Sequence, residues 1–367
     1  MPEVGDLRRQ WHDAGYTLEA YLTVDSSAHP SGGADAGSTA MRALLDVVLS
    51  IDSARAMGYE GGKWVVGVQG ITGDNGSGEV GVLQNYSNID AVEDRLQINR
   101  LWYQHSWHEG ETLVRIGKID ANSMFAGSVN ASHFIHSSMG YSPTILGLPT
   151  YPDPAFGAAV EHKLTSALSV SAGLFDGAGR AGVKTGLHGL GSTFERPGDA
   201  FMIAQGTYAW QDAETPVGNV SIGAWKHTGN FARFDGGTDD GTSGFYSVIE
   251  QRIDVDGRAL NTFMQLGTAD GDVAPIKNHV GLGLTTSDLF LPQYHDTLGL
   301  GVSWGETSSA SGAGFTASSE TAIELFYGAQ LVPGVRIKPD IQYIRNPGGD
   351  SSLDDAWVLT LRMTVSL

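Results

Sequence analysis

The 367-residue sequence lacks cysteine, is poor in charged residues and has no long apolar run. Without cysteine, the chain has no disulfides, no thiolate metal ligands and no cysteine nucleophile. Charged residues make up 17% of the sequence, and 41 acidic against 22 basic residues disfavour a nucleic-acid partner. No stretch contains the roughly 18 consecutive apolar residues that a membrane-spanning helix needs.

Glycine, by contrast, is abundant at 50 residues, which is typical of a strand-rich and turn-rich protein. The chain begins Met-Pro-Glu and has no apolar signal-peptide core. We therefore expect the mature form of an exported protein, with its signal peptide removed and a methionine added.

The clearest periodic signal is the C-terminal stretch 355–367, DAWVLTLRMTVSL. From Trp357 onward every second residue is apolar, so an extended strand would carry one uninterrupted apolar face. The other face would carry mostly polar side chains, among them Thr360 and Arg362. A transmembrane barrel strand requires this pattern, because its outer face meets lipid and its inner face meets a wet lumen.

The same alternation recurs along the chain, for example in RLQINRLWYQHSW (95–107) and TLVRIGKID (112–120). No long helical pattern separates these segments, so a parallel sheet with crossover helices is disfavoured. At about 9–11 residues per tilted strand plus its connection, the length suits about 16 strands. We predict an all-β fold, a transmembrane antiparallel β-barrel of about 16 strands over residues 17–367, preceded by a short helix within residues 1–16.

Residues 121–156 interrupt this alternation. The stretch contains four prolines and little periodicity, which predicts a long loop or a pair of loops. Its apolar side chains, such as Met124 and Phe134, argue against disorder, so we expect it to fold inward, into the barrel lumen. Further loops are expected at 176–200, 228–243, 306–320 and 345–354.

Several stretches resemble the carbohydrate-selective porins of the OprB family, which belong to Gram-negative outer membranes. They are residues 95–128, residues 152–177, the opening DLRRQWHDAGYTLEAYLTVD (6–25), and the run IKPDIQYIRNPGG (337–349) with the terminal strand. The resemblance implies a 16-stranded outer-membrane barrel through which sugars diffuse inward. One departure is the last residue, Leu367, because such barrels commonly end in Phe or Trp.

Strand phase selects the side chains that would line the lumen. Arg115 faces the lumen if Val114 and Ile116 meet lipid, and the same argument places Arg362 inside. Arginine suits sugar hydroxyls because its guanidinium donates several hydrogen bonds and keeps its charge. Each lumenal charge could instead brace the wall or solvate a wet interior. Other charged candidates of the lumen are Glu19, Asp46, Glu250, Arg252 and Asp254.

Aromatic side chains could offer flat surfaces to sugar rings or form the interfacial girdle of a barrel. Tyr103 shares its phase with Gln97 and Asn99 and is therefore predicted to face the lumen, while the adjacent Trp102 is predicted to join the girdle. Four more tryptophans near strand ends are predicted girdle residues: Trp107, Trp225, Trp304 and Trp357.

No cofactor or metal site is predicted. The GAGRAG run (177–182) matches a dinucleotide fingerprint, but no helical pattern follows it. His133 and His136 lack a third ligand at a fixed spacing. The acidic pairs Asp239 with Asp240 and Asp270 with Asp272 could hold calcium, but they are ordinary turn residues first.

We predict a passive outer-membrane channel, not an enzyme, that is selective for mono- or small oligosaccharides such as glucose and is surrounded by outer-membrane lipid. The preferred sugar, and assembly as a monomer or a trimer, are left open. One alternative is an outer-membrane barrel for another small polar solute, or for polysaccharide export or adhesion. Another is a soluble all-β glycoside hydrolase with a carboxylate pair such as Glu161 and Glu250.

Overall fold

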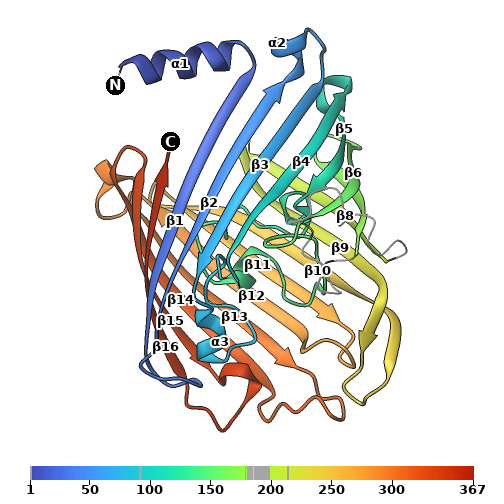
Figure 1. The fold of residues 1–367 in the computed structure, drawn as a ribbon, viewed down its shortest axis with the longest axis vertical. Helices are drawn as coiled ribbons and strands as arrows, with labels where there is room; N and C mark the ends of the chain where they lie inside the picture. Colours follow the sequence, from blue (N-terminus) through green and yellow to red (C-terminus); the bar gives the residue numbers. More distant parts are fainter. Residues whose placement is uncertain (1, 91–92, 178, 180–184, 186–198, 213–214) are drawn as a thin grey trace.

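Sixteen antiparallel strands form one closed barrel in the described residues of the computed structural model (Figure 1). Each strand pairs with its neighbours in the sequence, and β1 closes the ring by pairing with β16. The structure describes the chain except for residues 1, 91–92, 178, 180–184, 186–198 and 213–214. The predicted all-β barrel of about 16 strands is confirmed.

The strands are β1 (Tyr16–Ser31), β2 (Thr39–Asp52), β3 (Gly62–Gly73), β4 (Arg95–Trp107), β5 (Thr112–Ile119), β6 (Ala155–Lys163), β7 (Leu168–Asp176), β8 (Ala200–Asp212), β9 (Thr215–Ala232), β10 (Thr238–Val255), β11 (Arg258–Ala269), β12 (Ile276–Ser287), β13 (Thr297–Thr307), β14 (Ser319–Val332), β15 (Val335–Arg345) and β16 (Ala356–Ser366). The α-helices are α1 (Pro2–Asp13), α2 (Ser53–Met57), α3 (Gly76–Val80) and α4 (Ser137–Gly140), and 3-10 turns include His108–Gly110, Ala121–Ser123, Pro292–Tyr294 and Pro347–Gly349. Within the described part of the chain, every helix is too short or too polar to cross a bilayer.

Buried and exposed side chains alternate along the strands. In β16, Leu359 and Leu361 are exposed, whereas Thr360 and Arg362 are buried. A closed barrel has only two faces, so the exposed apolar side chains mark its outer surface, as lipid contact requires. The apolar alternation predicted for the terminal stretch is therefore present in the structure.

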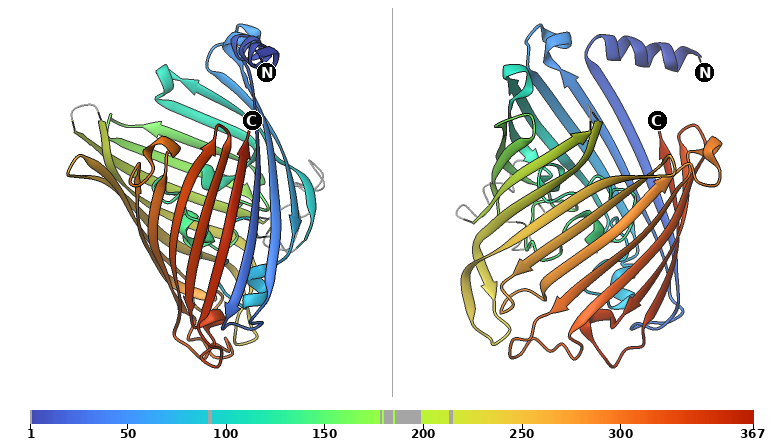
Figure 2. Two further views of the ribbon diagram at one scale, coloured as in Figure 1. Left: turned by 90° about the vertical axis from the view of Figure 1, so that its left-hand side faces the viewer. Right: turned by 180° about the vertical axis from the view of Figure 1, so that it is seen from behind.

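The two ends of the barrel differ in their connections. Both termini lie at the end where short turns, such as residues 256–257 and 333–334, join the strands (Figures 1 and 2). Long connections gather at the opposite end. In bacterial outer-membrane barrels the short turns face the periplasm and the long loops face outward, so the end with the termini is the periplasmic end.

Two long connections turn back into the barrel. We call residues 74–90 the first inner segment and residues 120–154 the second inner segment; both lie within the ring of strands in Figures 1 and 2. Most of their apolar side chains are buried, as Tyr86 and Ile135 illustrate at 1% and 0% exposure, whereas Val129 is exposed. The apolar core of this protein therefore lies inside the barrel, between the inner segments and the inward-facing side chains of the strands.

The remaining predicted loops have mixed outcomes. The expected loops 306–320 and 345–354 fall on the connections from β13 to β14 and from β15 to β16. Most of 228–243 is strand, because β9 and β10 extend to a short turn at residues 233–237. The expected loop 176–200 lies largely outside the described residues.

Candidate functional site: a polar cavity beside the inner segments

A buried carboxylate fastens the second inner segment to the barrel wall. Glu324 of β14 accepts the backbone N–H groups of Ile135 and His136 at 2.7 and 3.0 Å. The Glu324 side chain has no exposed surface. These two bonds hold the middle of this segment against β14.

Glu250 of β10 holds the beginning of the same segment. Its carboxylate accepts bonds from the Ser128 hydroxyl, the Asn130 backbone N–H and the Asn219 amide, each at 2.8 Å. Glu250 was predicted as a lumen-lining residue. It is 7% exposed, and its bonds hold the second inner segment in place.

The first inner segment is fastened in the same way by Glu320 of β14. This carboxylate accepts the backbone N–H groups of Leu83 and Gln84 at 2.8 Å and that of Gly348 at 2.7 Å. Glu320 is fully buried, and it joins the inner segment to the connection between β15 and β16.

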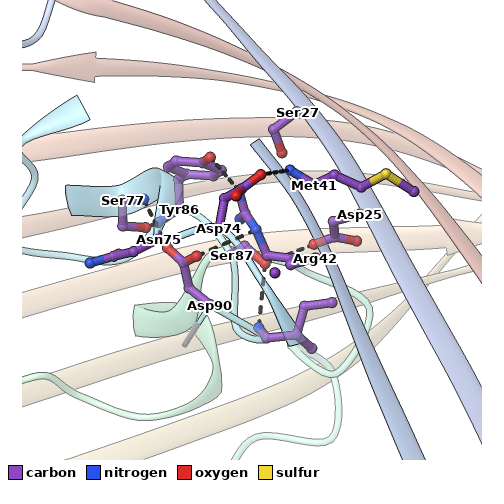
Figure 3. A network of polar contacts seen from close by, with 12 residues as sticks. Asp25, Ser27, Met41, Arg42, Asp74, Asn75, Ser77, Tyr86, Ser87 and Asp90 are labelled. Atoms are coloured by element: carbon purple, nitrogen blue, oxygen red, sulfur yellow. Dashed lines mark hydrogen bonds and ion pairs between the residues drawn. The ribbon is translucent and has the colours of Figure 1, made fainter. Parts of the chain in front are cut away.

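A second network connects the first inner segment to β2 (Figure 3). Arg42 of β2 donates to the Tyr86 hydroxyl and lies 3.4 Å from a carboxylate oxygen of Asp90. The Arg42 and Asp90 side chains are each 1% exposed. Asp90 also accepts the Ser77 backbone N–H at 2.9 Å, so the segment is held by both β14 and β2, which have β15, β16 and β1 between them in the ring.

The inner segments leave a polar cavity of about 250 Å³ beside β1–β4 and β16. The strands contribute Thr23, Leu44, Asp46, Gln69, Asn99, Arg100 and Arg362, and the inner segments contribute Asn88, Ile89, Asp120, Tyr151 and Pro154. Two of the predicted lumen-lining residues, Asp46 and Arg362, therefore meet at one cavity.

Arg362 is held by a carboxylate that the sequence analysis did not single out. Its guanidinium donates to Asp25 at 2.7 and 2.8 Å and to Asn88 at 2.8 Å. Asp25 is fully buried and accepts a further bond from Ser87 at 2.7 Å. Asp25 shares the strand phase of Glu19, and that phase was the sequence signal that could have identified it.

Asp46 lies opposite a small group of donors. It accepts bonds from Asn99 at 2.9 Å and Gln69 at 3.3 Å, and the Arg100 guanidinium lies 3.8 Å away. The Arg100 side chain is 35% exposed, so part of it remains accessible to a solute in the cavity. These four polar side chains form one hydrogen-bonding wall of the cavity.

A β-bulge in β4 overturns the predicted orientation of Tyr103. The pairing of β3 with β4 shifts between Gly67 and Val68, which places one extra residue, Asn99, in β4. Beyond the bulge the alternation is reversed, so Tyr103 lies on the outer face, with its ring 4.6 Å from that of Trp64. The prediction that Tyr103 lines the lumen is wrong, because a period-two pattern in the sequence does not reveal an inserted residue.

The same bulge turns Trp102 inward, so its predicted place in the girdle is also wrong. Trp102 packs against the apolar cluster inside the barrel, and the Arg115 guanidinium lies 4.2 Å from the centroid of its ring. Arg115 also donates to Gln104 at 2.9 Å and to Ser123 at 3.1 Å. Arg115 is absent from the cavity lining, and these bonds brace β5 against β4 and the second inner segment.

These orientations predict a large loss of stability when one of two adjacent aromatic residues is replaced and a small loss when the other is. Trp102→Ala is expected to lower the free energy of unfolding by about 3–5 kcal/mol, since it removes a large side chain from packed surroundings. Tyr103→Leu exchanges one lipid-facing side chain for another and is expected to cost far less. Urea unfolding in detergent or vesicles measures both; equal losses would contradict the assignment.

The remaining predicted residues lie outside the cavity. Glu19 is exposed, and Arg252 of β10 pairs with Asp254 at 3.3 Å, where both side chains are well exposed. Trp225 is 2% exposed and stacks on Phe201 inside the barrel, so its predicted girdle position is wrong.

The acidic turns at the outer rim bind an arginine. Arg233 pairs with Asp235 at 3.1 Å, Asp239 at 3.2 Å and Asp272 at 2.8 Å. Hydrogen bonding to the Arg233 guanidinium holds the pKa of Asp235 below its usual range. Among the described residues, no group of three or more His, Asp or Glu side chains is arranged to hold a metal ion.

Comparisons with solved structures agree with this architecture. The high-pH structure of OprB from Pseudomonas putida superposes with a TM-score of 0.86 at 17% identity, covering 100% of this chain and 97% of that one. The outer-membrane channel DcaP of Acinetobacter baumannii superposes with a TM-score of 0.55 at 13% identity, covering 96% and 97%. At these identities the likeness concerns the fold.

Sequence comparison identifies the family. A 47-residue stretch is 45% identical to QuiX of Acinetobacter baylyi, a match that spans 13% of this chain and 11% of that protein. The family model for the carbohydrate-selective porins of the OprB family matches residues 38–367. This chain therefore belongs to the OprB family of carbohydrate-selective porins, as an outer-membrane β-barrel.

Proposed function

We propose that the 250 Å³ cavity is the constriction through which neutral sugars diffuse passively toward the periplasm. The observation that carries this proposal is the lining itself. Arg100, Asp46 and Asn99 offer donors and acceptors in a confined space beside the second inner segment. Such a lining can replace the hydrogen bonds that sugar hydroxyls make with water, while remaining weak enough to release the sugar.

Charge pairing favours neutral solutes over ions. Both arginines that line the cavity have a carboxylate beside them, Asp25 for Arg362 and Asp46 for Arg100. Paired charges keep their hydrogen-bonding capacity but attract a solute ion weakly. We therefore expect conductance with little preference between small anions and cations.

Size and an aromatic side chain favour single sugar units. Ligand pockets are commonly about 300–1,000 Å³, so this cavity lies just below the usual range and suits one monosaccharide unit at a time. Tyr151 borders the cavity, and its hydroxyl donates to the Ile89 carbonyl at 3.0 Å, which fixes the ring. An aromatic face of this kind supports the apolar face of a pyranose.

The rival functions make different demands on the same residues. A hydrolase built on Glu161 and Glu250 would need a free carboxylate, whereas Glu250 already accepts three bonds that hold the barrel interior together. An export or adhesion barrel with a plugged lumen would pass no small sugar. We infer a channel without bond chemistry, exported to the outer membrane after removal of a signal peptide.

The test is sugar-dependent block of ionic current in planar bilayers, together with liposome swelling. Arg100→Gln is expected to raise the half-blocking concentration of glucose roughly tenfold. A hydrogen bond to a charged group contributes about 1.5–3 kcal/mol to binding, and in the variant a hydrogen bond from water to the sugar replaces part of this contribution. Arg115→Gln is the matched control, since Arg115 lies outside the cavity. Purified barrels that conduct neither ions nor sugars would refute the channel.

A further inference from the structure

The periplasmic end carries a helix that the proposed channel does not use. α1 ends at Asp13 and joins β1 through Gly15, which adopts a φ of +89°. This left-handed conformation favours glycine, and a Cβ at Gly15 would lie 2.8 Å from the Cβ of Arg55. Close approach to α2 therefore fixes the end of α1, which lies beyond the strand ends in Figures 1 and 2.

Two hydrogen bonds orient α1 on the rim. Arg8 donates to the Leu367 carbonyl oxygen at 3.3 Å, and Arg55 donates to the His12 carbonyl oxygen at 3.4 Å. These bonds tie the described half of α1 to the last residue of the chain and to α2.

The described half of α1 carries an apolar stripe. Leu7 and Trp11 are four residues apart, and they are 52% and 45% exposed. Asp13, two residues beyond Trp11 and on the other side of the helix, is 82% exposed at its side chain. α1 is thus amphipathic in its described half, and the barrel covers neither its polar side chains nor Leu7 and Trp11.

The same periplasmic rim carries an aromatic surface on the outside of β3 and β4. The rings of Trp64 and Tyr103 lie 4.6 Å apart, and those of His105 and Trp107 lie 4.2 Å apart. Tyr59, just after α2, is 57% exposed and lies against His105. Aromatic belts of this kind sit at the headgroup level of a bilayer.

We infer that α1 lies on the periplasmic surface of the outer membrane and inserts Leu7 and Trp11 between lipid headgroups. Amphipathic helices bind this interface through their apolar face. A second copy of the chain is a poorer occupant, because a stable protein interface buries about 800 Å² per partner and two side chains supply far less. The helix would extend the membrane contact of the barrel at the point where β1 and β16 close the ring.

The chain lacks cysteine, so single labelling sites can be introduced cleanly. Trp11→Cys and Leu7→Cys would each carry a polarity-sensitive fluorophore, and Asp13→Cys would carry the same probe as the matched control. The full-length variants would be reconstituted in phosphatidylcholine vesicles at low protein-to-lipid ratio. Heat-modifiable migration on gels checks that each variant forms the barrel.

At positions 7 and 11 we expect a blue-shifted emission that is quenched by lipids with a nitroxide near the headgroup and protected from aqueous iodide. At position 13 we expect the reverse. Iodide quenching at positions 7 and 11 as strong as at position 13 would overturn the inference. A blue shift that appears only as the protein-to-lipid ratio rises would also overturn it, because it would identify a second copy as the occupant.

Discussion

Replacing Glu324 with alanine is expected to raise the single-channel conductance and to admit longer oligosaccharides. The substitution leaves the backbone N–H groups of Ile135 and His136 without their acceptor in a buried place, at a cost of about 1–3 kcal/mol each. A cost of this size populates conformations in which the second inner segment has left the wall. Planar-bilayer recordings and liposome swelling with a maltose series measure the effect.

Two further variants make this prediction specific. Glu324→Gln keeps one acceptor oxygen and is expected to give an intermediate conductance. Glu19→Gln is the matched control, because it removes a carboxylate from an exposed position outside the inner-segment contacts described above. An unchanged conductance in Glu324→Ala, with the barrel correctly folded, would show that the segment is held without this carboxylate.

Replacing Arg362 with methionine is expected to destabilise the barrel by about 3–5 kcal/mol, since it leaves the fully buried Asp25 without its counter-charge. It also removes a donor from the cavity wall, so block of the current by glucose should weaken. Urea unfolding in vesicles reports the first effect, and the half-blocking sugar concentration reports the second.

A double-mutant cycle separates these two effects. Asp25→Asn combined with Arg362→Met removes both charges and should recover most of the lost stability, because the uncompensated charge is gone. Glucose block should stay weak in the double variant, since the donor is still missing. Recovery of the block together with stability would show that Arg362 acts on sugar only by supporting the wall.

Strand pattern alone predicted the barrel, but it assigned the wrong faces to side chains in β4. Alternation holds wherever each residue has one partner on the neighbouring strand, as in the terminal strand β16. At the bulge, β4 contains one residue more than the stretch of β3 that pairs with it, namely Asn99. Every later side chain of β4 therefore lies on the opposite face from the one that simple alternation predicts. The orientations of Trp102 and Tyr103 were therefore assigned the wrong way round, although the strand itself was predicted with its observed bounds.

The cavity could be predicted only in part. Arg362 and Asp46 were identified from strand phase. Asn88 and Tyr151 belong to the inner segments, whose path through the barrel cannot be predicted from a periodic pattern. The first inner segment was not singled out at all, although its buried Tyr86 lies in a stretch without alternation. Its position depends on acceptors such as Glu320, more than 200 residues away in the sequence.

The amino-acid pattern was enough to predict the barrel and its outer apolar surface, because lipid on one side and water on the other impose a period of two on the strands. Which polar side chains meet in the cavity depends instead on contacts between distant parts of the folded chain. Buried Glu250, Glu320 and Glu324 each accept a backbone N–H of an inner segment, and the space left beside β1–β4 depends on these distant contacts. The spacing of residues along the sequence does not reveal these contacts.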